Sequence, residues 1–149
     1  MNIKIIIDPI LPVTFEINGP KPTLPDLRAA VGNDDIELVP RFFELEPAHI
    51  NELKTMFVGL SRNKIASGRR NIDACTEAWR ALDRAIIDQP LTTKTCIAYC
   101  GEHGKMRGMD ENLDATWLWG KVLGLGFGEI GDILVGPVII LCGATDWID

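Results

Sequence analysis

The fold is decided by residues 96–143, which read CIAYCGEHGKMRGMDENLDATWLWG to residue 120 and KVLGLGFGEIGDILVGPVIILCG from there on. The apolar residues from Thr95 to Cys100 predict a strand. Asn112 or Asp114 is suited to cap a helix, and the apolar spacing that follows predicts that this helix runs to about Val122. A strand followed by a capped helix indicates that sheet and helix pack together in this part of the chain.

A polar turn and a closing strand complete this stretch. Gly101–Gly104 predicts a hairpin tip that leads into Lys105–Arg107. Glycines 124, 126 and 128 end the helix, and the apolar run Asp132–Ile140 predicts a strand in the sheet interior. The letters of Gly126–Gly131 match a dinucleotide-binding pattern, but they follow a helix and precede a strand, so no cofactor is expected.

The N-terminal third predicts a β-hairpin, a short helix and a third strand. Residues 3–7 are β-branched, and residues 13–17 alternate between apolar and polar. Thr23 and Asp26 have the spacing of a helix capping box, with Leu24, Leu27 and Val31 on one face and Gly32 at the end. Residues 36–39 predict the third strand, which ends at Pro40.

The middle of the chain changes to helical periodicity. Apolar residues recur at helical spacing within residues 46–88, which predicts two helices joined by a polar loop. We therefore expect one α+β domain over residues 1–149. Its sheet is mixed but mainly antiparallel, with five or six strands and two packed helices, and an αα-hairpin is inserted at residues 44–91.

Composition limits the function classes. The 149 residues contain 46% hydrophobic and 24% charged side chains, as expected for a globular protein, and the net charge is −6. Residues 95–149 hold eight acids and three bases, and residues 42–94 hold seven acids and eight bases. This distribution favours neither broad nucleic-acid binding nor a DNA mimic. The N-terminus lacks the features of a signal peptide, so we expect no membrane association and a cytoplasmic location.

Several short motifs resemble the domain-of-unknown-function family 3846, which is typical of phages and bacterial mobile elements. The resemblance covers roughly residues 23–41 and 95–143. Its motifs are Leu24–Gly32 followed by Ile36–Val39, Tyr99–Gly108, the set Asn112, Ala115 and Thr116, and Asp132–Gly136. His103 stands where the family has the second acid of a pair, and residues 42–94 form a helical insertion. The family has no assigned activity to carry over.

The resemblance implies a phage or mobile-element accessory protein in a bacterial host. Our first hypothesis is a non-enzymatic protein that binds and modulates a host factor, with a defence component as one candidate. The second is capture of a small anionic or nucleotide-like ligand. The third is an enzyme that uses Glu102, His103 and Asp110. The oligomeric state stays open.

The candidate binding residues lie in the insertion and on the C-terminal helix. Arg62, Lys64, Arg69 and Arg70 form a basic cluster, with no acid between residues 52 and 73. Such a cluster can face an anionic ligand, a nucleic-acid phosphate or an acidic protein surface. Trp117 and Trp119 are two residues apart on a helix and point to different faces, so one packs on the sheet; Trp119 is taken as a binding candidate.

The cysteines predict structure more than chemistry. Cys96, Cys100, His103 and Cys142 are the nearest set to a zinc site. Cys96 and Cys100 lie about 13 Å apart along a strand, which is too far for one ion. A Cys100–His103 nucleophile and base would lack an orienting third group. We therefore expect buried free thiols and no bound metal.

Overall fold

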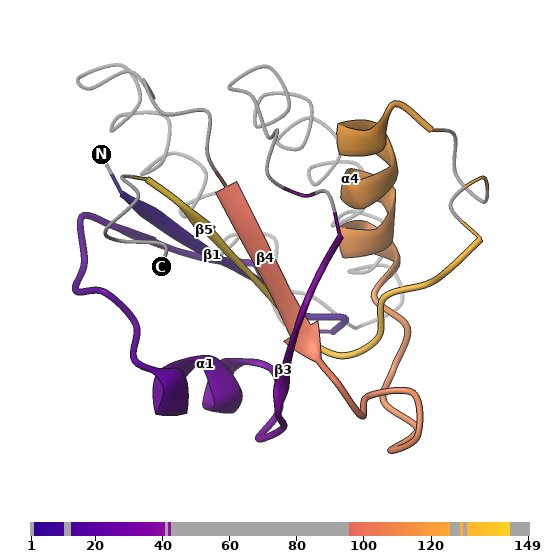
Figure 1. The fold of residues 1–149 in the computed structure, drawn as a ribbon, viewed down its shortest axis with the longest axis horizontal. Coiled ribbons are helices and arrows are strands. Elements are labelled where there is room, and N and C mark those ends of the chain that lie inside the picture. The colour runs from indigo at the N-terminus through magenta and orange to yellow at the C-terminus, as the bar shows by residue number, and fades with distance from the viewer. Residues whose placement is uncertain are drawn as a thin grey trace.

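The protein has a five-stranded sheet, shown in a computed structural model that describes residues 2–10, 13–40, 42, 96–125, 129 and 131–143. The strand order is β2-β1-β5-β4-β3, and every neighbouring pair is antiparallel (Figure 1). This confirms the α+β class, but the predicted mixture of parallel and antiparallel pairs is absent from the described strands. The strands are β1 Ile3–Ile7, β2 Thr14–Ile17, β3 Ile36–Leu38, β4 Cys96–Gly101 and β5 Val138–Cys142.

Two helices cover opposite faces of the sheet (Figure 1). Helix α4, Leu113–Leu123, packs Leu118 and Trp119 against the buried isoleucines at positions 3, 5 and 7 of β1. Helix α1, Leu24–Ala30, packs Leu27 on the other face, against residues 139 and 141 of β5. Because successive side chains of a strand point to opposite faces, β5 is buried at all five positions between the two helices.

Helix α1 begins with the predicted capping box. The Thr23 hydroxyl accepts a hydrogen bond from the Asp26 amide, and the Asp26 carboxylate accepts one from the Thr23 amide. Gly32 follows the helix with φ of +91°, as expected for the residue that turns the chain away. Leu24 does not share the buried face with Leu27: it is 48% exposed, so this part of the prediction is wrong.

A buried polar network fixes the start of α4. The Asn112 side chain caps the helix by accepting from the Ala115 amide, and it donates to the carbonyls of Ile7 and Gly136. The Thr116 hydroxyl donates to the Asn112 carbonyl and accepts from the Leu134 amide. Asn112 is 0% exposed. One side chain thus holds β1, α4 and the chain before β5 together.

The segment before β5 corrects the prediction of a long closing strand. Residues 131–137, called here the lead-in, run beside residues 110–112 and not within the sheet. The Gly136 amide donates to the Asp110 carbonyl, the Asn112 amide donates to the Leu134 carbonyl, and Glu111 forms an isolated bridge with Val135. Gly136 has φ of +69°, which redirects the chain into β5.

The prediction of a hairpin with its tip at Gly101–Gly104 is also wrong, because no described strand pairs with β4 directly after this turn. Residues 102–109, called here the tip loop, are turns: the Arg107 amide donates to the His103 carbonyl and the Met109 amide to the Gly104 carbonyl. The antiparallel partners of β4 are β3 and β5.

The strands that flank the predicted insertion are neighbours in the sheet. Leu38 of β3 pairs with Tyr99 of β4, and the Val39 amide donates to the Ala98 carbonyl at 2.8 Å. The chain therefore leaves β3 and returns in the adjacent strand, as expected for an insertion whose ends lie near Arg41 and Lys94. The αα-hairpin at residues 44–91 itself lies outside the described residues.

Candidate functional site

Three segments meet at one end of the sheet, where β4 ends (Figure 1). They are the turn between α1 and β3 (Gly32–Asp35), the tip loop and the lead-in. Charged contacts join them: Asp34 of the turn meets His103 and Arg107 of the tip loop, and Lys105 of the tip loop meets Asp132 of the lead-in. This end of the sheet gathers titratable side chains that are far apart in the sequence.

Asp34 anchors the tip loop to the turn. Its carboxylate accepts from the His103 backbone amide at 2.7 Å, lies 2.9 Å from Nδ1 of the His103 ring, and accepts from the Asp35 amide at 2.8 Å. The Asp34 side chain is 7% exposed, whereas that of His103 is 45% exposed. A buried carboxylate therefore fixes a half-exposed imidazole through its Nδ1 atom.

Arg107 and Gly101 complete this junction. The Arg107 guanidinium donates to the Gly32 carbonyl at 2.8 Å and lies 3.8 Å from the Asp34 carboxylate. A Cβ at position 101 would lie 3.0 Å from Asp34 Oδ2 and 3.1 Å from the Val31 carbonyl oxygen. Glycine at position 101 thus lets the turn approach the end of β4 closely.

The two partners shift each other's pKa. The side-chain hydrogen bond to Asp34 raises the pKa of His103, and the carboxylates of Asp34, Glu102 and Asp35 add to that shift. The hydrogen bond from the His103 ring lowers the pKa of Asp34, and the two backbone amides lower it further. The junction therefore favours imidazolium paired with carboxylate.

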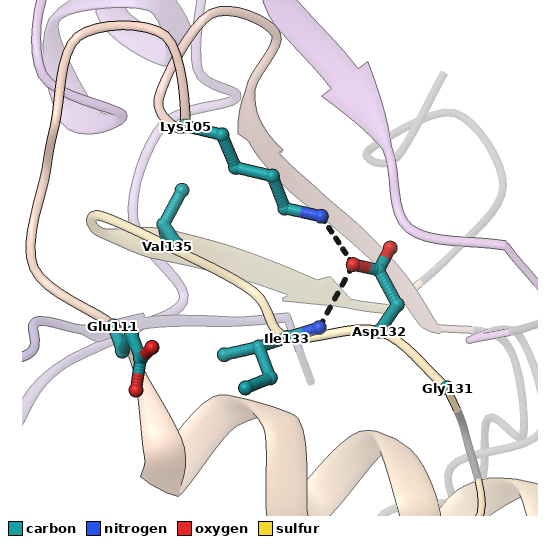
Figure 2. Close-up of a pocket in the computed structure, with 6 residues that line it drawn as sticks. All are labelled: Lys105, Glu111, Gly131, Asp132, Ile133 and Val135. Carbon is teal, nitrogen blue, oxygen red and sulfur yellow. Dashed lines mark hydrogen bonds and ion pairs between the residues drawn. The ribbon is translucent and has the colours of Figure 1, made fainter.

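A second contact joins the tip loop to the lead-in. Lys105 pairs with Asp132, and the Ile133 amide donates to the same carboxylate oxygen at 2.8 Å. Figure 2 shows Lys105 extended from the tip loop towards Asp132, above Val135 and Ile133. The hydrogen bond from Lys105 lowers the pKa of Asp132, so this carboxylate stays charged at neutral pH.

The ion pair lies in an open cavity of about 480 Å³ that Glu111, Gly131, Ile133 and Val135 also line (Figure 2). A smaller cavity of about 130 Å³ shares Lys105, Asp132, Ile133 and Val135, and its lining adds Glu37 and Glu102. We call the two cavities together the acidic hollow. Its described lining carries four carboxylates and one ammonium, with an apolar wall made by the lead-in.

Cys100 lines the smaller cavity of the acidic hollow. Burial and, to a smaller extent, the carboxylates of Glu37 and Asp132 raise the pKa of its thiol to about 11, against a small opposing effect of Lys105. A thiol with this pKa carries almost no thiolate at neutral pH, so Cys100 is poorly suited to be a nucleophile. The predicted alternative of a Cys100–His103 pair is not favoured, because the His103 ring hydrogen-bonds to Asp34.

The candidate enzyme residues are brought together only in part. Ligand atoms of Glu102, His103 and Asp35 lie within 4.8 Å of one another, so these three side chains could hold a divalent cation. The third member of this group is Asp35, whereas the sequence suggested Asp110. The backbone carbonyl of Asp110 instead accepts a hydrogen bond from the Gly136 amide. The three side chains are exposed, and exposed groups of this kind are common without an ion.

Two of the cysteines correct the prediction of free thiols. Cys96 and Cys142 face each other in β4 and β5 and form a disulfide, with Cα atoms 4.2 Å apart. This bond also removes both residues from the suggested zinc set. Cys100 is a free buried thiol on the same face as Cys96, as expected. Cys75 lies outside the described residues.

The two tryptophans of α4 divide as expected between core and surface. Trp119 is 7% exposed, and its indole N–H donates to the Pro40 carbonyl at 2.9 Å. Trp117 is half-buried, and the Lys121 ammonium lies 5.0 Å from its ring centroid. This placement makes Trp119 a packing residue that ties α4 to the end of β3, and it argues against Trp119 as a binding residue.

Sequence reasoning named His103 and Glu102 but missed the contacts between distant residues that shape this end of the sheet. Asp34 and His103 are 69 positions apart, and Lys105 and Asp132 are 27 apart, so no local spacing linked them. The one available signal was the excess of acids in residues 95–149. The predicted binding residues Arg62, Lys64, Arg69 and Arg70 lie outside the described residues.

Among the described residues, no helix is both long and apolar enough to cross a membrane. Comparisons with protein-family models, with curated proteins and with solved structures found no match to this chain. The resemblance to family 3846 therefore stays a prediction carried by short motifs. Two of these motifs have structural roles here: Asn112 and Thr116 hold the start of α4, and Gly136 turns the lead-in into β5.

Proposed function

We propose that this protein is a non-enzymatic accessory protein of a phage or mobile element, and that it binds and modulates a host factor, for which a defence component is one candidate. Its partner docks at the end of the sheet that carries the acidic hollow. The observation that carries the proposal is the hollow itself, a concave site whose larger cavity has a volume of about 480 Å³ and which combines charged groups with an apolar wall.

Two of the segments that form the hollow also carry exposed apolar side chains. Met106 of the tip loop is 87% exposed, and Ile133 of the lead-in is 37% exposed. Methionine is an adaptable contact residue because its side chain is flexible and polarisable. An apolar contact beside polar groups that fix orientation is the usual composition of a binding site.

The polar groups at this end of the sheet favour binding over chemistry. The thiol of Cys100 has a raised pKa, and the imidazole of His103 is held by Asp34. The Asp34–His103 contact, which fixes the tip loop to the turn, is already made in the free protein. A surface ordered before binding loses less entropy on association, which supports recognition of a partner.

Site-specific photo-crosslinking tests the proposal. A photoreactive residue at position 106 should give a discrete crosslinked product in host lysate, and mass spectrometry should identify the same protein in replicate experiments. Position 14, which is exposed on the opposite edge strand β2, is the matched control. Equal products at positions 14 and 106, or none at 106, would contradict docking at this end of the sheet.

A further inference from the structure

We propose that the acidic hollow binds an arginine or lysine side chain of the partner, and that Lys105 occupies this position in the free protein. This inference rests on the proposed function and names the chemistry of the partner at the same site. Two observations carry it: the charge balance of the lining and the position of the Lys105 ammonium.

The lining has an excess of negative charge. Lys105 and Asp132 neutralise each other, and three further carboxylates remain: Glu37, Glu102 and Glu111. Among the described residues, no ion pair engages these three side chains. The carboxylates also act on Cys100, which lines the smaller cavity, since Glu37 and Asp132 both raise the pKa of its thiol. A cation is therefore the ligand that this lining favours.

The shape selects a cation on an aliphatic stem. Ile133 and Val135 form the wall beside Asp132 and Glu111, so a long side chain could bury its methylene groups on the wall while its charge meets the carboxylates (Figure 2). Within the chain, Lys105 extends past Val135 and places its ammonium on Asp132 (Figure 2). Its side chain is 62% exposed, so a partner could displace it without unfolding the loop. A guanidinium can also bind a carboxylate through two parallel hydrogen bonds.

Displacement of Lys105 by the partner predicts that one variant binds more tightly than wild type. Lys105→Gln removes the internal competitor and one positive charge, so it should tighten binding of a cationic peptide. Asp132→Asn and Glu111→Gln should weaken binding. Each change should be about two- to fivefold, which is the range for one exposed charge contact.

The probe is a fluorescein-labelled, capped peptide with two arginines spaced by glycine, followed by fluorescence anisotropy on the whole chain. Its matched control carries citrulline, the neutral isostere of arginine. Glu16→Gln removes one negative charge on the far edge of the sheet, where Glu16 pairs with Lys4, and it should leave binding unchanged. Backbone amide shifts of Ile133 and Val135 in NMR spectra locate the peptide.

The inference is supported if Lys105→Gln binds the arginine peptide more tightly than wild type and if binding is lost when citrulline replaces arginine in the peptide. Weaker binding by Lys105→Gln would overturn it, because Lys105 would then contact an acidic ligand. Equal binding of the citrulline peptide, or displacement of the arginine peptide by low-micromolar Ca²⁺, would also overturn it. If crosslinking at position 106 succeeds and the arginine peptide fails, the proposed function stands without this chemistry. The reverse result would remove the proposed function and keep the cation site.

Discussion

Two kinds of cross-link hold this fold together, and they differ in burial and charge. The first kind is buried and neutral: the Asn112 and Thr116 network and the Cys96–Cys142 disulfide. The second kind is charged and reaches the solvent: the Asp34–His103 pair, in which a buried carboxylate meets a half-exposed imidazole, and the Lys105–Asp132 pair, in which both side chains are exposed. Buried hydrogen bonds have no competition from water, whereas exposed ion pairs exchange readily with solvent, salt and other ligands. The buried set therefore specifies the fold, and the charged set is free to serve binding.

The disulfide should give the largest effect on stability. It joins residues 46 positions apart, and closing a loop of this length lowers the entropy of the unfolded chain. Reduction, or a Cys96→Ala/Cys142→Ala variant, should lower the free energy of unfolding by about 4 kcal/mol. Urea denaturation with and without reductant measures this. The control is Cys100→Ala, which keeps the disulfide and should therefore lose stability on reduction as wild type does. Full alkylation of Cys96 and Cys142 in denatured, unreduced protein would show that the bond is absent.

Asn112→Ala should have the next largest effect. The variant loses the cap of α4 and leaves the carbonyls of Ile7 and Gly136 without their donor. Leaving buried polar groups unpaired should destabilise the protein by about 3 kcal/mol. Thr116→Val keeps the shape of the side chain and loses only the hydroxyl contacts, so it should cost about half as much. Equal effects of the two substitutions in urea denaturation would contradict the central place of Asn112.

His103→Gln should have a smaller effect that depends on pH. The raised pKa of His103 means that its contribution is fully present below the unfolded value of about 6.5 and is lost as pH rises through the folded value. The lowered pKa of Asp34 means that its contribution is lost at acid pH. The difference in Tm between wild type and variant should therefore be largest near pH 5–6 and shrink towards pH 9. Thr14→Ala should show no such trend. A Tm difference for His103→Gln that does not change with pH would contradict a charged Asp34–His103 pair.

Lys105→Gln should have the smallest effect on stability. The side chains of Lys105 and Asp132 are 62% and 48% exposed, so the pair should contribute less than about 0.5 kcal/mol and weaken with salt. Urea denaturation at two salt concentrations measures this. If Lys105→Gln lowered the free energy of unfolding as much as Asn112→Ala does, the Lys105–Asp132 pair would belong with the contacts that determine the fold.

Local features could be predicted from the sequence, and contacts between distant segments could not. The Thr23–Asp26 capping box and the Asn112 cap were correct because each involves residues three apart. The strand predicted at Asp132–Ile140 was too long. Apolar periodicity does not show that the lead-in forms its backbone hydrogen bonds with Asp110 and Asn112 and not with a strand of the sheet. The disulfide was missed because it requires the register of β4 against β5. The acidic hollow was missed because its residues come from distant parts of the chain: Glu37 of β3, residues between 100 and 111, and the lead-in.

The separation of fold from binding is tested most directly by comparing two variants in the same two assays. Thr116→Val changes the buried set, and the Glu111→Gln/Asp132→Asn double variant changes the lining of the hollow. The assays are the urea unfolding midpoint and the crosslinking yield from position 106 at a temperature where every variant is folded. We predict that Thr116→Val lowers the midpoint and keeps the yield, whereas the double variant keeps the midpoint nearly unchanged and loses most of the yield. A double variant that crosslinks as well as wild type would contradict the acidic hollow as the binding site.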